Sequence, residues 1–298
     1  GLVDHELSFS VEELGRKFTP AEVFATMQCA GNRRSEMSAM KKVGGVQWGS
    51  GAISTAKWKG VRLADVLRAA GLKDTAKHVQ FTGFDPVDNK GVVAPFGASI
   101  PVEKALASEV LLAWGMNDAN TLTPEHGFPL RVVVPGVYGV RSVKWLDTIT
   151  VAAEESPNFF QQKAYKITPP TMDDTNVDWS VAKPLQEMFV NSAIASVAVE
   201  SGGKTARARG YAMPTGQPGD AIAKVELSTD GGSTWQEGKL LGDDKPFCWR
   251  LWEGEIALPA GAKAVTVRAS TKKGVVQPMQ VDWNFKGYCY NAAQTRAI

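Results

Sequence analysis

The chain has 298 residues, which is long enough for two domains with well-filled cores. Its 33 basic and 31 acidic side chains leave a net charge of +2, and no apolar run approaches the roughly 18 residues that span a bilayer, so we expect neither a nucleic-acid nor a membrane partner. The 3 widely spaced cysteines form no disulfide framework, which fits a soluble protein of a reducing, intracellular compartment.

The first half of the chain mixes short helices and strands irregularly. The spacing of Ser10 and Glu13 is that of a capping box and predicts a helix from Ser10 to about Lys17, and the alternation over residues 22–28 predicts a strand. Further expected elements are an amphipathic helix over 62–70, a strand over 79–84, a short helix over 101–107, an apolar segment over 110–114, and strands over 130–134 and 143–151. This irregular order indicates an α+β domain rather than a doubly wound sheet.

The second half of the chain reads as short strands with turns and no helix. Residues 223–228 alternate, Asp230-Gly231-Gly232 forms a turn signal, and residues 234–235 return, which predicts a hairpin. Residues 247–256, 264–269 and 275–283 continue the strand pattern. We expect a first domain over residues 1–180, whose last residues include a linker-like stretch at 173–178. We expect an immunoglobulin-like antiparallel β-sandwich over residues 181–298.

Cys29 is the residue whose surroundings suggest chemistry most directly. It stands where a predicted strand runs into a glycine turn, and Arg33 and Arg34 follow within five residues. A thiolate suits soft or high-valent transition metals, while nearby arginines favour the ionised sulfur and attract anions. A lone cysteine after a strand is, however, more often a small buried hydrophobe. The residues by themselves leave both readings open.

The motif around Cys29 resembles the signature of the sulfite oxidase family of molybdopterin enzymes. Residues 29–37 read CAGNRRSEM, and further segments similar to that family read GAISTAKW at 51–58, FGASIP at 96–101, HGFPLRVVVPG at 126–136, RSVKWL at 141–146 and WRLW at 249–252. The resemblance runs over nearly the whole chain. It implies a mixed α+β molybdopterin-binding domain followed by an immunoglobulin-like dimerisation domain, and hence a homodimer.

The resemblance also implies a molybdenum–molybdopterin cofactor and the residues that bind it. Cys29 matches the cysteine that ligates the molybdenum. Asp85 matches an acid that contacts the pterin. His126 and Arg131 match residues that contact the pterin and its phosphate, and Ser142, Val143 and Lys144 match a segment that binds the same cofactor.

The implied reaction is oxidation of sulfite to sulfate by oxygen-atom transfer. Arg34, Trp48, Tyr165 and Arg250 match the anion site of the family. Two arginines suit a dianion, because a dry site needs charge-assisted donors to hold it. The electron acceptor implied is dioxygen or a haem protein, with a haem of this protein itself expected only in a domain beyond the given sequence.

Two alternatives stay open on the sequence. Assimilatory nitrate reductase shares the family fold and the metal cysteine, but Ser35 and Arg250 stand where such relatives usually have a lysine and an uncharged residue. The second alternative is a non-catalytic dimeric fragment unable to load cofactor, because the resemblance implies that an N-terminal part of the catalytic domain is missing here. By resemblance, the compartment is the mitochondrial intermembrane space or the peroxisome.

Overall fold

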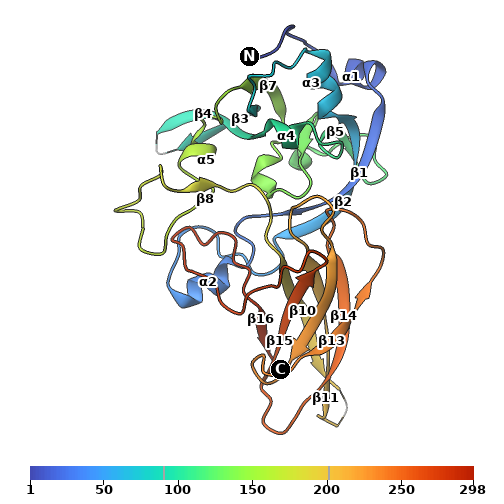
Figure 1. Ribbon diagram of the computed structural model, residues 1–298, viewed down its shortest axis with the longest axis vertical. Coiled ribbons are helices and arrows are strands. Elements are labelled where there is room, and N and C mark those ends of the chain that lie inside the picture. The colour runs from blue at the N-terminus through green and yellow to red at the C-terminus, as the bar shows by residue number, and fades with distance from the viewer. Residues whose placement is uncertain (90, 201) are drawn as a thin grey trace. The chain divides into compact units, whose positions relative to one another are not determined.

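The computed structural model describes residues 1–89, 91–200 and 202–298 (Figure 1). The Cα positions fall into two compact units, each formed by segments that alternate along the chain. The first unit contains Gly1–Ala30, Ala56–Thr168 and Val177–Gln186, and the second contains Gly31–Thr55, Pro169–Asn176 and Glu187–Ile298. The domain boundary expected between residues 180 and 181 stays a prediction.

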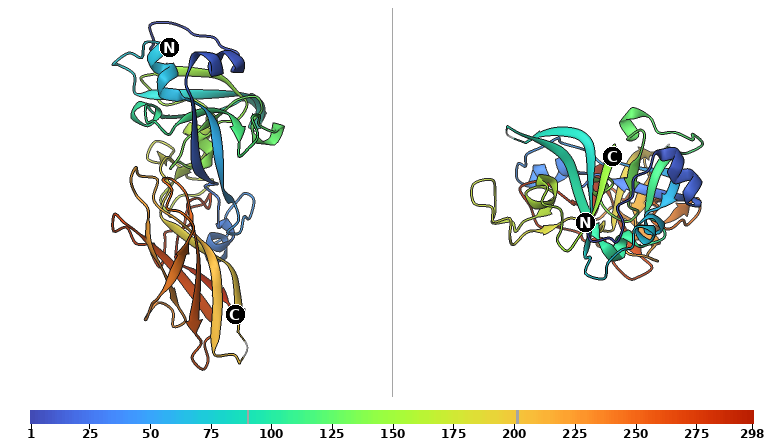
Figure 2. Two further views of the ribbon diagram at one scale, coloured as in Figure 1. Left: turned by 90° about the vertical axis from the view of Figure 1, so that its right-hand side faces the viewer. Right: turned by 90° about the horizontal axis from the view of Figure 1, so that it is seen from above.

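Two sheets form the frame of the first unit. The larger has the strand order β1 (Pro20–Gln28), β2 (Ile53–Arg62), β5 (Leu111–Met116) and β6 (Arg131–Val133). The smaller places β3 (His78–Asn89) between β4 (Val92–Pro101) and β7 (Leu146–Ala152). The views in Figure 2 show β3 and β4 as a long curved hairpin, drawn in teal.

Short helices and turns connect these strands. They are α1 (Val11–Lys17), α3 (Leu63–Ala69), α4 (Val102–Ala105), η1 (Pro124–His126), η2 (Gly139–Arg141) and α5 (Phe159–Gln162), with the small strand pair β8 (Lys166–Ile167) and β9 (Lys183–Pro184). The predicted capping box at α1 is confirmed, because the Ser10 side chain accepts from the Glu13 N–H and the Glu13 carboxylate accepts from the Ser10 N–H.

The larger apolar core of the first unit packs strands of both sheets against its helices. Its members have lost nearly all contact with solvent and come from strands and helices alike, among them Val61, Leu63, Phe81, Ile100 and Val132. Burying side chains of this size stabilises a fold by about 1.5–3 kcal/mol each before chain entropy is counted. This core therefore fixes β6 and the segment that leads into β7, near which predicted cofactor residues lie. A second apolar cluster, which includes Ala25 and Trp58, holds β1 in place.

Seven strands build the second unit. Their order is β10 (Asn191–Val199), β11 (Thr205–Met213), β14 (Arg250–Ala257), β13 (Gln236–Leu241), β12 (Ile222–Ser228), β15 (Ala264–Thr271) and β16 (Gln294–Ala297). The two ends of this order meet, because Arg296 Nη1 donates to the carbonyl oxygens of Ile194 and Ala195 at 2.9 Å. The sheet thus folds over an apolar core that includes Trp252, as expected of the predicted sandwich.

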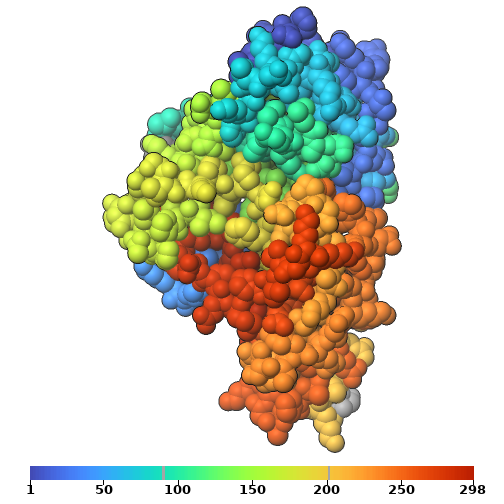
Figure 3. Space-filling view, viewed as in Figure 1, coloured from blue at the N-terminus to red at the C-terminus, as the bar shows by residue number. Residues whose placement is uncertain are grey.

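The second unit also contains the helix α2 (Arg34–Met40), which no local pattern predicted. The C-terminal segment packs against it: Trp283 Nε1 donates to the carbonyl oxygen of Lys41 at 2.8 Å. Figure 3 shows this blue segment at the surface directly beside the red C-terminal residues. Residues far apart in the sequence therefore build this part of the unit together.

Most of the predicted elements are confirmed, and one is wrong. The expected hairpin exists as β12 and β13, with Leu227 opposite Gln236, and no helix occurs among the described residues after position 180. The strand expected over 275–283 is wrong, because this stretch is irregular apart from a single bridge between Ser270 and Val276. The strand expected from residue 143 begins at Leu146. Among the described residues, no helix is long and apolar enough to cross a membrane.

Candidate functional site

Cys29 directly follows the last residue of β1. Its side chain is partly buried and forms no disulfide. Met27, two residues earlier, lies beside Arg131, whose Nη2 is 3.4 Å from the Met27 sulfur. An added Cβ on Gly139 would lie 3.4 Å from the carbonyl oxygen of Gln28, so η2 passes close to the end of β1. The thiol therefore sits near the segment that contains Ser142 and Val143.

Arg131 is a buried cation at the start of β6. Its guanidinium donates to the carbonyl oxygens of His126 at 2.9 Å and Ser142 at 3.0 Å and lies over the Trp58 ring. No carboxylate of the described residues forms an ion pair with it, and burial lowers the pKa of Arg131 to about 10. A buried charge without a counter-ion is costly, so this site favours an anionic ligand.

Lys144 supplies a second cation close to Arg131. Its Nζ donates to the carbonyl oxygen of Glu125 at 2.9 Å and lies 4.0 Å from the centre of the Trp145 ring. Burial and then the charge of Arg131 lower the pKa of Lys144, against the opposing effects of Asp85 and Glu125. The two cations thus repel each other, and a phosphate bound near both would relieve that repulsion.

Asp85 lies in β3 and carries an unused acceptor. Its Oδ1 is buried and has no hydrogen-bond partner. Burial raises the pKa of Asp85, although Lys144 acts in the opposite direction. Gly83 leaves room for this carboxylate, because an added Cβ there would lie 2.5 Å from Oδ1. A buried acceptor without a donor fits a ligand that brings N–H groups, such as a pterin.

The other predicted cofactor residues are His126, Ser142 and Val143, and Arg131 donates to the carbonyl oxygens of His126 and Ser142. His126 is exposed, with Nδ1 2.8 Å from the hydroxyl of Thr123. Ser142 Oγ accepts from the N–H of Val134 at 3.0 Å, and the Val143 carbonyl oxygen accepts from the N–H of Val132 at 2.8 Å. These contacts fix the backbone of the segment, while the predicted contacts of these residues with the cofactor stay predictions.

The residues of the first unit fit the implied cofactor. The predicted cofactor residues offer one thiol and two cations, Arg131 and Lys144, of which Arg131 has no carboxylate partner among the described residues. They also offer the buried Oδ1 of Asp85, which has no described donor. The described part of the chain has no cluster of three or more histidine, cysteine, aspartate or glutamate side chains that could cage a metal. A metal held by Cys29 would therefore take its remaining ligands from the cofactor.

In the second unit, Arg33 is fully buried and its charge is matched. Its guanidinium binds the Glu36 carboxylate through two hydrogen bonds of 2.9 and 2.6 Å and also donates to Asn191 and to the Ala292 carbonyl oxygen. Its backbone is left-handed, with φ of 65°. Arg33 thus ties α2 to the strands of the sandwich, a role that the sequence analysis did not assign.

Arg34, the next residue, is also almost buried, with 7% of its surface exposed. Nε donates to the Lys286 carbonyl oxygen at 3.0 Å and Nη1 to that of Val46 at 2.8 Å, and the guanidinium lies 5.4 Å from the centre of the Tyr288 ring. No carboxylate of the described chain pairs with it, and Nη2 donates to no described acceptor. The N–H groups of Nη2 therefore remain available to an anion.

Trp48 lies on a loop that is hydrogen-bonded to the start of α2. The Trp48 carbonyl oxygen accepts from the N–H of Ser35 at 3.1 Å, and that of Gly49 accepts from the N–H of Arg33 at 2.8 Å. The Trp48 side chain is 46% exposed, so it is not a core residue. A ring in that position is accessible to a ligand.

Tyr165 belongs to the first unit and has a left-handed backbone, with φ of 51°. Its carbonyl oxygen accepts from the N–H of Leu185 at 2.8 Å and from Nη2 of Arg141 at 3.4 Å. A non-glycine residue in this conformation costs about 1–2 kcal/mol and persists where its surroundings hold it. The contact expected between the phenol and a ligand stays a prediction.

Arg250 begins β14 of the second unit and has partners of its own. Its Nε and Nη2 donate to the carbonyl oxygens of Leu241 at 3.2 Å and Gly242 at 3.0 Å, and Nη1 lies 3.8 Å from the Asp244 carboxylate. Asp244 is shared with Lys272 at 2.6 Å. Its predicted role in anion binding is untested by these contacts.

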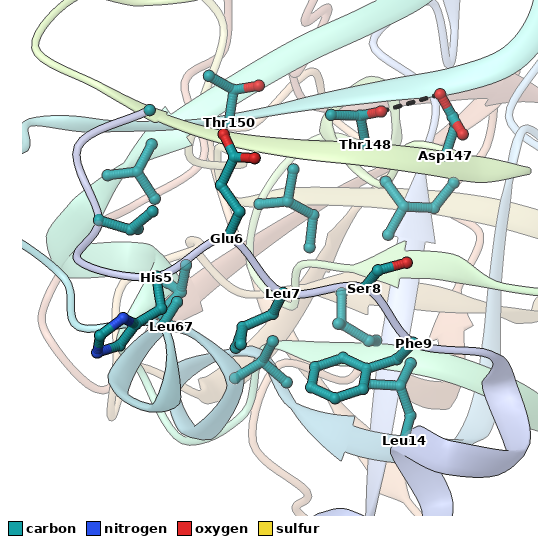
Figure 4. A pocket seen from close by; sticks show the side chains of 18 of the residues that line it. His5, Glu6, Leu7, Ser8, Phe9, Leu14, Leu67, Asp147, Thr148 and Thr150 are labelled. Atoms are coloured by element: carbon teal, nitrogen blue, oxygen red, sulfur yellow. Dashed lines mark hydrogen bonds between the residues drawn. The ribbon is translucent and has the colours of Figure 1, made fainter.

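None of the predicted site residues lines a hollow of about 530 Å³ in the first unit (Figure 4). Figure 4 shows the N-terminal segment crossing it, with Phe9 beside Leu14 and the Asp147–Thr148 hydrogen bond on β7. Its lining includes the carboxylates of Glu6 and Asp147 but no lysine or arginine. Charge therefore argues against an oxyanion at this place.

Two family models match the chain. The model described as "Oxidoreductase molybdopterin binding domain" matches residues 1–160, and the one described as "Mo-co oxidoreductase dimerisation domain" matches residues 178–296. The chain therefore belongs to the family of molybdopterin-binding oxidoreductases that includes the sulfite oxidases. This agrees with the donor set found in the first unit.

Individual relatives are similar over nearly the whole chain. "Sulfite oxidase, mitochondrial" of Homo sapiens is 45% identical over 96% of this chain and 54% of its own length, and "Sulfite oxidase" of Arabidopsis thaliana is 39% identical over 96% and 81%. "Nitrate reductase [NAD(P)H]" of Hordeum vulgare is 35% identical over 98% of this chain and 35% of its own length. The chain thus spans about half the length of the mammalian relatives it matches.

A solved structure shares the fold. The sulfane dehydrogenase SoxCD from Paracoccus pantotrophus superimposes with a TM-score of 0.81 at 28% sequence identity, covering 99% of this chain and 73% of that one. The predicted fold class, an α+β cofactor domain followed by a β-sandwich, is confirmed.

Proposed function

We propose that the protein oxidises sulfite to sulfate with a molybdenum–molybdopterin cofactor. The observation that carries the proposal is Arg34, a nearly buried guanidinium with no carboxylate partner in the described chain and with Nη2 uncommitted. Such a group favours an anion strongly, because its charge is poorly solvated and otherwise unmatched. It follows the proposed metal ligand Cys29 by five residues along the chain.

The residues of the first unit have the roles that a cofactor requires. Cys29 would hold the molybdenum through its thiolate, Arg131 and Lys144 would neutralise the phosphate, and Asp85 would accept from the pterin. His126, Ser142 and Val143 would complete the phosphate and pterin contacts. When bound, the cofactor supplies the two-electron oxygen-atom transfer that converts sulfite to sulfate.

The remaining predicted residues would orient the anion. Arg34 would donate two charge-assisted hydrogen bonds to sulfite oxygens, and Arg250 a further one after exchanging part of its contact with Asp244. Trp48 would exclude water from one side, and the Tyr165 hydroxyl would donate a hydrogen bond. Together these groups hold a dianion without moving a proton to or from it.

The similarity also supports a homodimer, since a dimerisation-domain model matches residues 178–296. We expect light scattering of the purified protein to give twice the mass of 32.0 kDa. Dioxygen or a haem protein would accept the electrons. The mammalian relatives are named as mitochondrial enzymes, which favours mitochondria over peroxisomes as the location.

The test is to express the chain in cells that make the cofactor and to measure molybdenum and sulfite turnover together. We expect about one molybdenum per chain and sulfite-dependent reduction of an artificial electron acceptor. Replacing Arg34 by Met should leave the molybdenum content unchanged and raise KM for sulfite at least about tenfold, the loss expected of one charge-assisted hydrogen bond. A molybdenum-loaded protein that ignores sulfite would refute the proposal.

A further inference from the structure

We propose that three glycines, Gly31, Gly45 and Gly287, are positioning residues that hold the Arg34 side chain in its anion-binding orientation. Gly31 precedes α2, Gly45 follows it, and Gly287 lies in the C-terminal segment of the second unit. An added Cβ on any of the three would meet the Arg34 side chain. The inference rests on the proposed role of Arg34 in binding sulfite and goes beyond it, because it assigns a role to residues that touch no substrate.

Gly31 faces the end of the guanidinium. An added Cβ at Gly31 would lie 2.6 Å from Cζ and 2.9 Å from Nη1 of Arg34, and it would also collide with Nη2. These three atoms are the nearest neighbours of that position, and all belong to one side chain. The uncommitted Nη2 is therefore the atom that any side chain at position 31 would displace first.

Gly45 and Gly287 enclose the remainder of the side chain. An added Cβ at Gly45 would lie 3.0 Å from Nη1, and one at Gly287 would lie 2.6 Å from Cγ of Arg34. The neighbouring carbonyl oxygens of Val46 and Lys286 accept the two hydrogen bonds of Arg34. Because Gly45 and Gly287 have no side chain, the backbone next to each of them comes close enough to accept a hydrogen bond from the guanidinium.

Steric confinement matters here because no described carboxylate forms an ion pair with Arg34. A carboxylate would orient the guanidinium but would also cancel the charge that an oxyanion needs. Arg33, next in the chain, shows that alternative: Glu36 holds it with two hydrogen bonds and matches its charge. The backbone at the three glycines fixes the orientation of the Arg34 side chain without neutralising its charge, which stays available to an anion.

The sharpest test replaces Gly31 by Ala. Gly31 has an ordinary backbone conformation, whereas Gly45 and Gly287 have φ of 90° and 62°, where any side chain adds strain. Because the collision in Gly31→Ala involves the end of a flexible side chain, Arg34 should move and the fold should remain. We expect KM for sulfite to rise about tenfold, with kcat changed less than about threefold and the molybdenum content unchanged.

The matched control is Gly44→Ala. Gly44 lies next to Gly45, but an added Cβ there meets no atom within 4 Å. We expect KM for sulfite in this variant to equal that of the parent protein within error. The double variant Gly31→Ala, Arg34→Met should have the same KM as Arg34→Met alone, because Gly31 acts through Arg34.

A second readout does not depend on turnover. Sulfate should raise the thermal unfolding midpoint of the parent protein, since a ligand that binds the native state stabilises it. The shift should be lost in Gly31→Ala and in Arg34→Met but kept in Gly44→Ala. A crystal structure of Gly31→Ala should show the guanidinium away from the Val46 carbonyl oxygen.

The outcomes separate this inference from the proposed function. If Arg34→Met raises KM and Gly31→Ala does not, the glycines do not position Arg34 and the inference is overturned while the function stands. If Arg34→Met leaves both KM and the sulfate shift unchanged, the proposed role of Arg34 is wrong. If Gly31→Ala lowers stability and KM changes further in the double variant, its effect is general rather than through Arg34, which also overturns the inference.

Discussion

At the scale of single residues, the adjacent arginines Arg33 and Arg34 differ in what compensates their charge. Arg33 is fully buried against the Glu36 carboxylate, whereas Arg34 is nearly buried and donates to carbonyl oxygens but to no described carboxylate. A matched buried charge holds a structure together, while an unmatched one gains most from binding an anion. The sequence motif shows two adjacent arginines, and their contacts give the physical reason why their proposed roles differ.

Arg131 resembles Arg34 in being a buried cation without a described carboxylate partner. Because burial lowers the pKa of this guanidinium to about 10 and no described carboxylate pairs with it, a bound phosphate should be its counter-ion. We expect Arg131→Gln to lose most of its molybdenum, measured by elemental analysis of the purified protein. The exposed Arg16→Gln is the control and should keep the parent content. Full loading of Arg131→Gln would contradict this role.

Asp85 gives a prediction for stability against pH in cofactor-free protein. Burial raises the pKa of this carboxyl above its unfolded value, so the folded state binds the proton more tightly. Stability therefore falls as pH rises through the interval between the unfolded and folded pKa values, and this loss remains at neutral pH. Asp85→Asn has no such loss, so its unfolding midpoint should exceed the parent's by on the order of 1 °C at pH 7.

Measuring the difference in unfolding midpoint between Asp85→Asn and the parent protein as a function of pH tests whether ionisation of Asp85 causes it. The gain of Asp85→Asn should shrink to zero as pH falls below the unfolded pKa of aspartate, about 3.9. A gain that stays constant between pH 3 and pH 7 would mean that packing, not ionisation, is responsible. In loaded protein the same variant should bind the pterin less well, because the amide replaces one acceptor oxygen by a donor.

At the scale of elements, helix α2 shows how tertiary contacts can replace a local start signal. Its N-cap residue is Arg33, in a left-handed conformation and without a side-chain cap. We expect Arg33→Met to destabilise the protein by about 3 kcal/mol, because it leaves Glu36 and Asn191 without their buried partner. Denaturant unfolding measures this loss. Arg16→Met on the exposed face of α1 should change stability by less than about 0.5 kcal/mol.

These elements also show what the sequence could and could not predict. Helices α1 and α3 and the β12–β13 hairpin have local signals, a capping box, an amphipathic stripe and a glycine turn, and all three are confirmed. Helix α2 has none and was missed. The stretch 275–283 alternates like a strand, but among the described residues it finds a partner only at one bridge. Pairing, not alternation, decides a strand.

In the candidate site, too, the sequence predicts some residues and not others. The motif around Cys29 predicts both the proposed metal ligand and Arg34, because the two lie in one contiguous run of residues. The glycines around Arg34 lie at positions 31, 45 and 287, and Asn32 donates to the Tyr211 hydroxyl across 179 positions. Such contacts have no pattern along the chain, so only the folded structure could identify them.

At the scale of the whole molecule, the net charge of +2 gives no general attraction for anions. The attraction must come from local cations that lack carboxylate partners, Arg131 in the first unit and Arg34 in the second. Because charges farther apart than about 8 Å are screened at physiological ionic strength, distant surface residues contribute little to binding sulfite. This local origin makes single substitutions at these arginines informative.

The most direct test of the proposed activity compares sulfite and nitrate on one preparation of molybdenum-loaded protein. Sulfate formation is followed with sulfite and an electron acceptor, and nitrite formation is followed with nitrate and a reductant. The account predicts rapid production of sulfate and nitrite production at no more than background. Turnover of nitrate together with no oxidation of sulfite would contradict it and assign the protein to the reductases of the same family.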